Sequence, residues 1–328
     1  MLQAEPSPPS TSLSLIAADM REVDRVITER LATGVPLVAQ VSRYIVGAGG
    51  KRLRPALLLL VCQALGFHGD SRFKLAAVVE FIHTATLLHD DVVDESSLRR
   101  GRATANAMFG NAASVLVGDF LYSRAFQMMV EANNMQILEV LADATNVIAE
   151  GEVMQLMNMH NADLDETMYL DVIRSKTAKL FEACARVGAI LAGASSSVEQ
   201  ACASYGQALG TAFQIVDDVL DYTGDVKLLG KNLGDDLREG KTTLPLIAAK
   251  RLASAPEQAI LVSAIENGDI SQINTLVEIV QNTGALAVAQ QAAAEEARRA
   301  IAAIALLPDN EFKACLLQLG LQLLERKA

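Results

Sequence analysis

Apolar residues recur every three to four positions in segment after segment of this chain, which is the spacing of helices that bury one face. Strand signals are sparse, because aromatic residues make up 4% of the sequence and Trp is absent. Turn-forming clusters such as Gly34-Val35-Pro36 and Ser195-Ser196-Ser197 separate the periodic segments. The pattern predicts an all-α fold with helices over 13–32, 36–47, 52–65, 72–95, 111–131, 135–159, 166–192, 198–222, 242–253, 256–266, 270–282, 284–305 and 310–327.

Length and composition favour one large domain. The chain has 328 residues, of which 51% are hydrophobic and 20% charged, so it can bury a sizeable core. No linker-like stretch divides the sequence after residue 12, and we expect a single domain over 13–328. Residues 1–12 are rich in Pro and Ser, which predicts a disordered tail.

The charge balance and the cysteines restrict partners and compartment. Lys and Arg total 28 against 39 Asp and Glu, a net charge of −11, which argues against nucleic acid and against polybasic docking on lipid. The four cysteines show no CxxC spacing, as in a reduced cytoplasmic protein. No apolar run approaches the ~18 residues of a membrane span, and no basic residue precedes Arg21. We therefore expect a cytoplasmic protein without an integral membrane segment or a secretion signal.

Two acidic clusters carry the clearest chemical signal. Asp90-Asp91-Val92-Val93-Asp94 and Asp217-Asp218-Val219-Leu220-Asp221 share the pattern DDxxD. In a helix, positions i and i+4 lie on one face about 5–6 Å apart, so each box projects two carboxylates from one stripe. Acids this close repel one another unless hard cations hold them, and carboxylate oxygen is the ligand that Mg²⁺ prefers. The duplicated pattern predicts a magnesium site.

Each box also ends a long, nearly uncharged helical segment, EFIHTATLLHDD in one case and YGQALGTAFQIVDD in the other. The negative end of the helix dipole adds to the attraction for cations there. Two such helices that face each other would form an apolar cavity with a metal-binding mouth. The alternative is a pair of solvated acidic helix ends, although solvated acids seldom follow such apolar segments twice.

The boxes belong to a larger set of motifs. With Gly49-Gly50-Lys51-Arg52-Leu53-Arg54-Pro55 and the segment ESSLRRG after the first box, they resemble the trans-prenyltransferases, from about residue 13 to the C-terminus. The segments HTATLLHDDVVDESSLRRG, FGNAASVLVGDF and EGEVMQLMN most resemble the bacterial octaprenyl diphosphate synthases. The resemblance implies a helical bundle of the isoprenoid synthase type around a central apolar cavity. It also implies a long-chain enzyme that condenses isopentenyl diphosphate onto allylic diphosphates such as farnesyl diphosphate, for the ubiquinone side chain.

This resemblance assigns the metal site to the six acids of the boxes, Asp90, Asp91, Asp94, Asp217, Asp218 and Asp221. It implies three Mg²⁺ per active site, two bound by Asp90 and Asp94 and one by Asp217, with the allylic diphosphate between the boxes. Asp91 and Asp218 would support the metal ligands rather than bind the ions themselves.

Basic residues complete the implied substrate sites. Lys51, Arg54, His83 and Arg100 match the family's isopentenyl diphosphate site, and Arg99 matches its contact to the allylic diphosphate. Lys51 and Arg54 flank a Gly-rich turn, where backbone and side-chain donors can converge on a diphosphate. Taken alone, His83 on an apolar helix would indicate a hydrogen-bonded core residue.

Three further residues match groups at the reacting centre. The resemblance gives Lys176 to the leaving diphosphate, and it uses Thr177 and Gln214 as oxygen dipoles near the developing cation. Without it, Lys176 and Thr177 would indicate a solvent-facing lysine beside a threonine bonded to its own helix.

The Gly-rich stretch 223–241 matches a loop that closes over the site. Lys231 and Lys241 match its basic residues, and we expect Asp235 and Asp236 to anchor it. The alternative is a plain flexible surface loop.

Small residues before the first box bear on product length. Ala85 and Thr86 stand five and four positions before Asp90, where bulky aromatics close the pocket of short-chain relatives. Here a growing chain could pass, and the floor of the cavity would lie deeper, with Met128, Met129 and Phe126 as candidates.

Other functions stay open at this point. The product could be nonaprenyl (solanesyl) diphosphate, or the chain could be a non-catalytic regulatory prenyltransferase subunit. Terpene cyclases and head-to-head synthases fit less well, because their acidic motifs differ from a repeated DDxxD. We expect a homodimer, since 111–131 carries unpaired apolar positions, and delivery of the insoluble product to the membrane through transient association.

Overall fold

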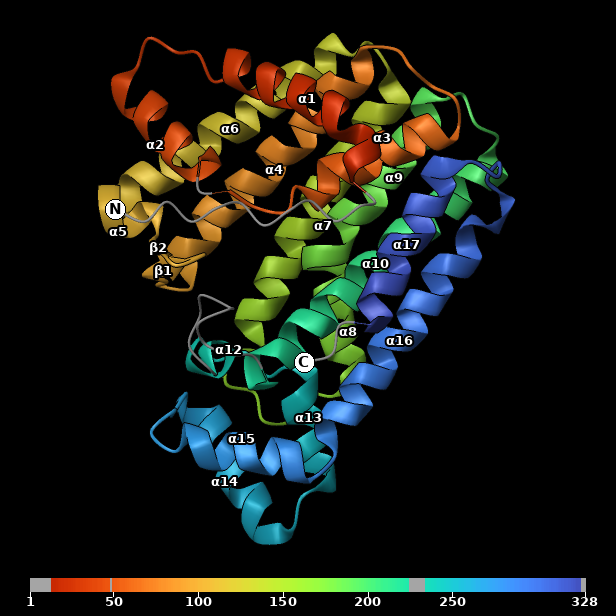
Figure 1. Cartoon of the computed structure of the whole chain (residues 1–328). Helices are drawn as coiled ribbons and strands as arrows, with labels where there is room; N and C mark the ends of the chain where they lie inside the picture. Colours follow the sequence, from red (N-terminus) through yellow and green to blue (C-terminus); the bar gives the residue numbers. More distant parts are fainter. Residues whose placement is uncertain (1–12, 48, 224–233, 326–328) are drawn as a thin grey trace.

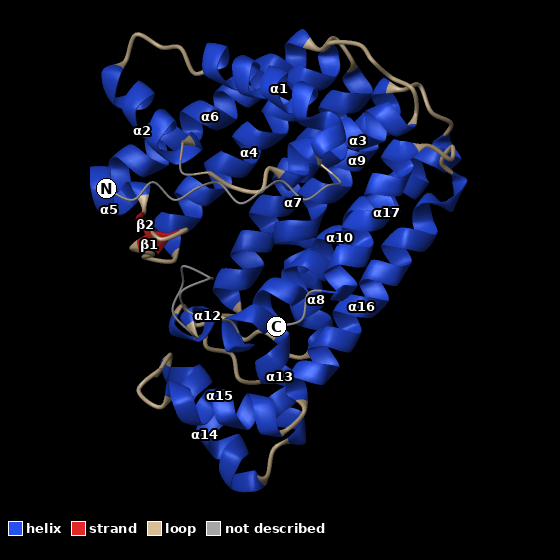
Figure 2. Ribbon diagram, in the orientation of Figure 1, coloured by secondary structure: helices blue, strands red, loops and turns tan. Residues whose placement is uncertain are grey.

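Helices dominate the computed structural model, which describes residues 13–47, 49–223 and 234–325 (Figures 1 and 2). The predicted tail over 1–12 and Lys231 lie outside the described residues. The first half of the chain contains η1 (Ser14–Ile16), α1 (Ala17–Arg30), α2 (Pro36–Val46), α3 (Leu53–Ala64), α4 (Ser71–Val93), α5 (Ala105–Phe109), α6 (Asn111–Glu131) and α7 (Met135–Met157). The second half contains α8 (Glu166–Ile173), η2 (Arg174–Ala178), α9 (Lys179–Leu191), α10 (Ser196–Thr223), α12 (Asp235–Arg238), α13 (Leu244–Leu252), α14 (Ala255–Asn267), α15 (Ile273–Asn282), α16 (Ala285–Ala303), η3 (Ile304–Leu306) and α17 (Glu311–Glu325). The all-α prediction is confirmed.

Local sequence signals explain several helix ends. Ser254 and Glu257 form a reciprocal capping box at the start of α14, and Gly268 ends that helix in the left-handed conformation with φ 59°. Asn134 caps α7 by accepting a hydrogen bond from the backbone N–H of Ile137 at 3.1 Å. Within the described ranges, none of the helices combines the length and the apolarity needed to cross a lipid bilayer.

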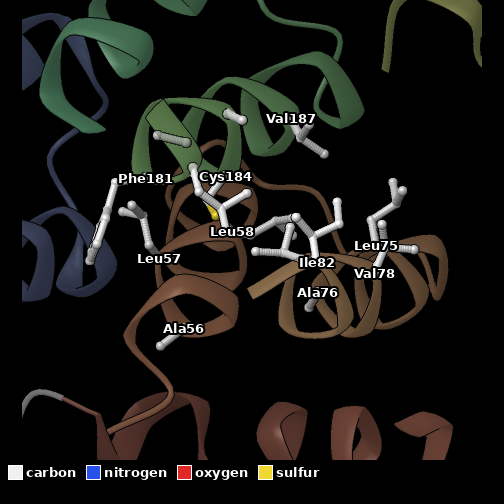
Figure 3. Close-up of a cluster of buried hydrophobic side chains, with 14 of the residues drawn as sticks. Ala56, Leu57, Leu58, Leu75, Ala76, Val78, Ile82, Phe181, Cys184 and Val187 are labelled. Carbon is white, nitrogen blue, oxygen red and sulfur yellow. The ribbon is translucent and has the colours of Figure 1, made fainter. Parts of the chain in front are cut away.

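The core is built around α3, whose apolar residues are almost all buried. Figure 3 shows Leu58 of α3 between Cys184 of α9 and Ile82 of α4. At Gly188 of α9, a Cβ atom would lie only 2.9 Å from Cβ of Val61, so the absent side chain lets α3 and α9 approach closely. This tight packing fixes the helices that carry the site.

The two acidic boxes end two long helices. The first box closes α4, which packs along α6, and the second lies near the end of α10, which packs against α9 and α16 (Figure 1). Because α4 also packs against α1 and α3, both helices are held on more than one side, and their ends are fixed relative to each other.

The structure departs from the predicted elements in a few short segments. After the first box, β1 (Leu98–Arg99) pairs antiparallel with β2 (Arg102–Ala103). Arg100 and Gly101 connect them with φ of 53° and 72°, the positive values of a tight hairpin turn. The segment predicted as one helix over 166–192 is interrupted by η2, a π-helical turn. Such turns are frequent at functional sites.

Candidate active site

A cavity of about 950 Å³ brings most of the predicted site residues together. Its walls come from the loop before α3, from α4, the β-hairpin, α7, η2, α10 and α12. The predicted residues that line it are Lys51, Arg54, His83, Thr86, Asp90, Asp94, Arg99, Arg100, Lys176, Thr177, Gln214, Asp217, Asp218, Asp235, Asp236 and Lys241. Ala85, Asp91 and Asp221 are not part of the lining.

In the first box, one carboxylate differs from the other two. Asp91 is fully buried, and its Oδ1 accepts a hydrogen bond from Nε of Arg99 at 2.8 Å. A terminal nitrogen of the same guanidinium forms an ion pair with Oδ1 at 2.7 Å. Burial raises the pKa of Asp91, although Arg99 opposes that shift. Asp90 and Asp94 face the cavity, so Asp91 anchors the box and fixes Arg99 beside it.

The second box has the same division of roles. Asp218 is 2% exposed and accepts hydrogen bonds from the Tyr169 hydroxyl at 2.5 Å and from Nε2 of Gln214 at 2.7 Å. Burial raises the pKa of Asp218 well above its ordinary value. Asp221 is also buried, and its Oδ2 accepts the backbone N–H of Asp236 at 3.4 Å, whereas Asp217 is exposed on the cavity side.

Two lysines face the carboxylates that line the cavity. Nζ of Lys176 lies 3.7 Å from Oδ2 of Asp90 and 2.5 Å from Oε2 of Glu152. Nζ of Lys241 lies 2.8 Å from Oδ2 of Asp94 and 2.7 Å from Oε2 of Glu239.

The surroundings of these ion pairs change the pKa of a lysine and of a glutamate. Burial alone would disfavour the charge on Lys241, but the carboxylates of Asp94 and Glu239 raise its pKa above the ordinary value. Burial, and then the charge of Asp90, raise the pKa of Glu152 to about 7 in spite of Lys176. The cavity wall near α4 therefore carries closely spaced acidic and basic side chains.

The donor set fits hard cations. Asp90, Asp94 and Asp217 offer only carboxylate oxygens, the ligands that Mg²⁺ prefers. Within the described ranges, no three carboxylate, imidazole or thiolate groups come close enough to enclose an ion by themselves. That agrees with the usual mode of Mg²⁺, which is bound through one or two carboxylates, water and substrate phosphates rather than by a protein cage.

Cations gather around His83 on the same cavity. Arg54 lies with its guanidinium 4.5 Å from the ring centroid of Phe181, and its terminal nitrogen is 3.3 Å from Nε2 of His83. Burial lowers the pKa of His83 well below its ordinary value, and Arg54 lowers it further. Because a guanidinium can only donate, Nε2 of His83 is the acceptor in its contact with Arg54.

The Gly-rich turn before α3 lets Arg100 approach the backbone. Gly50 has φ +148°, and a Cβ atom there would lie 2.6 Å from a terminal nitrogen of Arg100. A larger residue would therefore displace the guanidinium. Glu80, which lines the same region, lies 3.4 Å from Nε of Arg52, and burial raises the pKa of this glutamate.

The π-helical turn η2 positions Lys176 and Thr177. Oγ1 of Thr177 donates to Oε1 of Gln214 at 2.9 Å, and Gln214 in turn donates to Asp218. A Cβ atom on Gly151 of α7 would lie 2.7 Å from the backbone nitrogen of Lys176, and one on Gly210 of α10 would lie 2.7 Å from Cα of Ala178. Both glycines are needed because two helices press directly on this turn.

Six acidic or aromatic residues that line the cavity were not assigned from the sequence: Glu80, Glu152, Tyr169, Phe181, Phe213 and Glu239. Glu152 lies in EGEVMQLMN, a segment that carries part of the family resemblance, so a signal was present there. Tyr169 has no local signal, because its partner Asp218 lies 49 residues away in the sequence. Glu239 lies two residues before Lys241 in the stretch 223–241, so a signal was present there too.

The predictions on product length have mixed outcomes. Thr86 lines the cavity, whereas Ala85 is fully buried in the main hydrophobic cluster together with Met128 and Met129, and their roles stay predictions. The assignment of Phe126 to the cavity floor is wrong. Its side chain is 39% exposed and lines a separate groove on the outer face of α6, because that helix turns this position away from the core.

Comparison with known proteins agrees with this geometry. The chain is 52% identical over 308 residues to the octaprenyl diphosphate synthase of Escherichia coli. This alignment covers 93% of this chain and 95% of that protein. It is 45% identical to an all-trans-nonaprenyl-diphosphate synthase (geranyl-diphosphate specific) of Rhodobacter capsulatus, over 96% of this chain and 97% of that one.

A solved structure is similar over nearly the whole chain. The polyprenyl synthase of Caulobacter crescentus, complexed with calcium and isoprenyl diphosphate, superposes with a TM-score of 0.93 at 44% identity. The match covers 98% of this chain and 100% of that one. The profile of the polyprenyl synthetase family matches residues 35–281. With its two DDxxD boxes on one cavity, this chain belongs to the polyprenyl synthetase family.

Proposed function

We propose that this protein is an octaprenyl diphosphate synthase that lengthens allylic diphosphates, such as farnesyl diphosphate, by repeated addition of isopentenyl diphosphate. One observation carries the proposal: both DDxxD boxes line the same cavity as the cations Lys51, Arg54 and Arg100. One diphosphate can be held between the boxes and another at the cations. The 52% identity to the Escherichia coli enzyme supports an octaprenyl product.

Asp90, Asp94 and Asp217 would hold the metal ions, three Mg²⁺ per site. Bound Mg²⁺ supplies a Lewis acid that neutralises the leaving diphosphate. Asp91 and Asp218 keep the boxes in place, because each is buried and hydrogen-bonded to a neighbouring side chain.

The chain's own groups then act on the substrates. Lys176 and Lys241 donate hydrogen bonds to the diphosphate that departs from the allylic carbon, which lowers the barrier to breaking the C–O bond. The oxygens of Thr177 and Gln214 face the cation that develops on the allyl group. Lys51, Arg54, His83 and Arg100 hold isopentenyl diphosphate so that its double bond attacks this carbon. The cation formed by this attack then loses a proton to the departed diphosphate, which restores a double bond in the lengthened chain.

Product length tests the proposal directly. Purified protein is incubated with farnesyl diphosphate, excess isopentenyl diphosphate and Mg²⁺, and the dephosphorylated alcohols are sized by mass. A dominant C40 alcohol is expected. A stop at C15–C20 contradicts the long-chain assignment, and no product at all favours a non-catalytic regulatory subunit.

Nonaprenyl diphosphate is the second candidate product, since the chain is also 45% identical to a nonaprenyl synthase. A dominant C45 alcohol in the same assay would select it. The two products differ by one isoprene unit, so the volume of a single side chain at the cavity floor could decide between them.

We also propose a homodimer. Helix α6 exposes a stripe of large apolar side chains, Val115, Leu116, Phe126 and Val130, with exposed fractions from 37% to 66%. A stripe of this kind is typical of a surface that a partner covers. Sedimentation of wild-type protein should give a dimer, and Leu116→Glu should weaken it. A wild-type monomer contradicts the proposal.

The remaining assignments follow from the family. We propose one polyprenyl synthase domain over 13–328, a cytoplasmic location, and transient membrane contact when the product is handed on. The proposed use is the side chain of ubiquinone.

A further inference from the structure

Glu152 forms the shorter of the two ion pairs of Lys176, and the proposed reaction gives it no role. Its Oε2 lies 2.5 Å from Nζ of Lys176, whereas Oδ2 of Asp90 lies 3.7 Å from the same nitrogen. The Glu152 side chain is 28% exposed and lines the cavity, so it shares one space with the first acidic box. The ammonium group therefore lies between two carboxylates and is bonded to the one that is not in the box.

Backbone packing fixes this geometry. Gly151, the residue before Glu152, lies so close to η2 that a Cβ atom would be 2.7 Å from the backbone nitrogen of Lys176 and 2.8 Å from Cβ of Ser175. Helix α7 and the π-helical turn are thus in direct contact where the two side chains meet. The Glu152–Lys176 pair therefore differs from an ion pair between two long, solvent-exposed side chains, which is held weakly.

We propose that Glu152 is a positioning residue that draws the Lys176 ammonium away from Asp90 and so leaves Asp90 available to Mg²⁺. This inference rests on the proposed role of Asp90 as a magnesium ligand. Glu152 acts through Lys176 and needs no contact with substrate or metal.

Electrostatics explains why such a residue is needed. Without Glu152, the carboxylate closest to Lys176 would be Asp90, and a direct ion pair between them would compete with a divalent cation for the same oxygens. Held by Glu152, Lys176 keeps donors for the leaving diphosphate, since an ammonium group has three.

The test compares Glu152→Gln, Lys176→Gln and the double variant. Two Mg²⁺ titrations are compared. The first gives the Mg²⁺ concentration for half-maximal activity. In the second, Tm is followed as Mg²⁺ is added in the presence of inorganic diphosphate, and the Mg²⁺ concentration at half of the total rise in Tm is recorded. Glu152→Gln should raise both by about tenfold to a hundredfold, the usual effect of residues behind a metal ligand. The double variant should need no more Mg²⁺ than Lys176→Gln alone, because the competing ammonium is gone.

Glu150 provides the matched control. It lies two residues earlier on α7, and its Oε1 accepts a hydrogen bond from Asn146 at 2.9 Å on the exposed surface. Glu150→Gln should leave both Mg²⁺ concentrations unchanged. Tm without ligands shows whether each variant is folded.

Two outcomes overturn the inference: Glu152→Gln needs no more Mg²⁺ than Glu150→Gln, or the double variant needs as much as Glu152→Gln. The variant Asp90→Asn distinguishes an error in the role of Glu152 from an error in the proposed metal site. If Asp90→Asn leaves the diphosphate-dependent Mg²⁺ midpoint unchanged, the role of Asp90 itself is wrong.

Discussion

The hydroxyl of Tyr169 supports the second acidic box, and Tyr169→Phe removes that group alone. In the wild-type protein, the hydroxyl donates to Oδ2 of Asp218 at 2.5 Å, and Gln214 donates to Oδ1 at 2.7 Å. Tyr169 and Asp218 are 3% and 2% exposed, so water has little access to replace the lost donor. One oxygen of a buried carboxylate would lose its donor.

The size of the effect follows from this burial. Leaving a buried oxygen without its hydrogen-bond donor costs about 1–3 kcal/mol, so we expect a loss of about 2 kcal/mol in stability. For a chain of 328 residues, that loss corresponds to a decrease of about 3 °C in Tm. Because Asp218 also holds Gln214, which holds Thr177, the site should loosen as well. We expect the Mg²⁺ requirement to rise and kcat to fall by about tenfold or more.

Tyr205→Phe is the matched control for this experiment. Tyr205 is fully buried, and its hydroxyl donates to the backbone oxygen of Leu316 at 2.7 Å, a contact between α10 and α17. It should lower Tm by a similar or smaller amount, since the acceptor is neutral, with kcat and the Mg²⁺ requirement unchanged. If Tyr169→Phe behaves like Tyr205→Phe in both kinetic quantities, the support of the box through Asp218 is refuted.

Three further predictions concern the same cavity. Asp90→Ala should lower turnover by orders of magnitude with an unchanged circular dichroism spectrum, and an active variant would contradict the metal assignment. Thr86→Phe should shorten the product because Thr86 lines the cavity. Ala85→Phe should shorten it only if the growing chain passes through the buried cluster that contains Ala85. Mass analysis of the dephosphorylated alcohols measures the product length of each variant. Burial and Arg54 lower the pKa of His83, so below about pH 6.5 the unfolded chain gains a proton that the folded state does not take up. Stability should therefore fall with decreasing pH, by up to about 1.4 kcal/mol per pH unit, and His83→Gln should reduce this loss in thermal unfolding, whereas the exposed His68→Gln should not.

Glycines show how far local sequence reasoning reaches. Gly268 ends α14 in the left-handed conformation, a role that sequence rules anticipate for a glycine after a helix. Gly151 and Gly188 lie inside helices, where glycine is locally unfavourable, and only the neighbouring η2 and α3 explain them. Within a helix, the need for a glycine comes from a neighbouring segment that packs too closely to leave room for a side chain.

Helical periodicity and the i, i+4 spacing are local properties, so the helical fold and the position of each DDxxD box at the end of a long apolar helix can be predicted from the sequence alone. Tertiary packing sets which acids are exposed to the cavity and which are buried as supports. Asp91 and Asp218 take the second role because Arg99 and Tyr169 reach them, and Tyr169 does so across 49 residues of chain. It also placed Lys241 on Asp94, 147 residues away, and turned Phe126 outward. Such pairings depend on how helices pack against one another, which the spacing within any single helix does not specify.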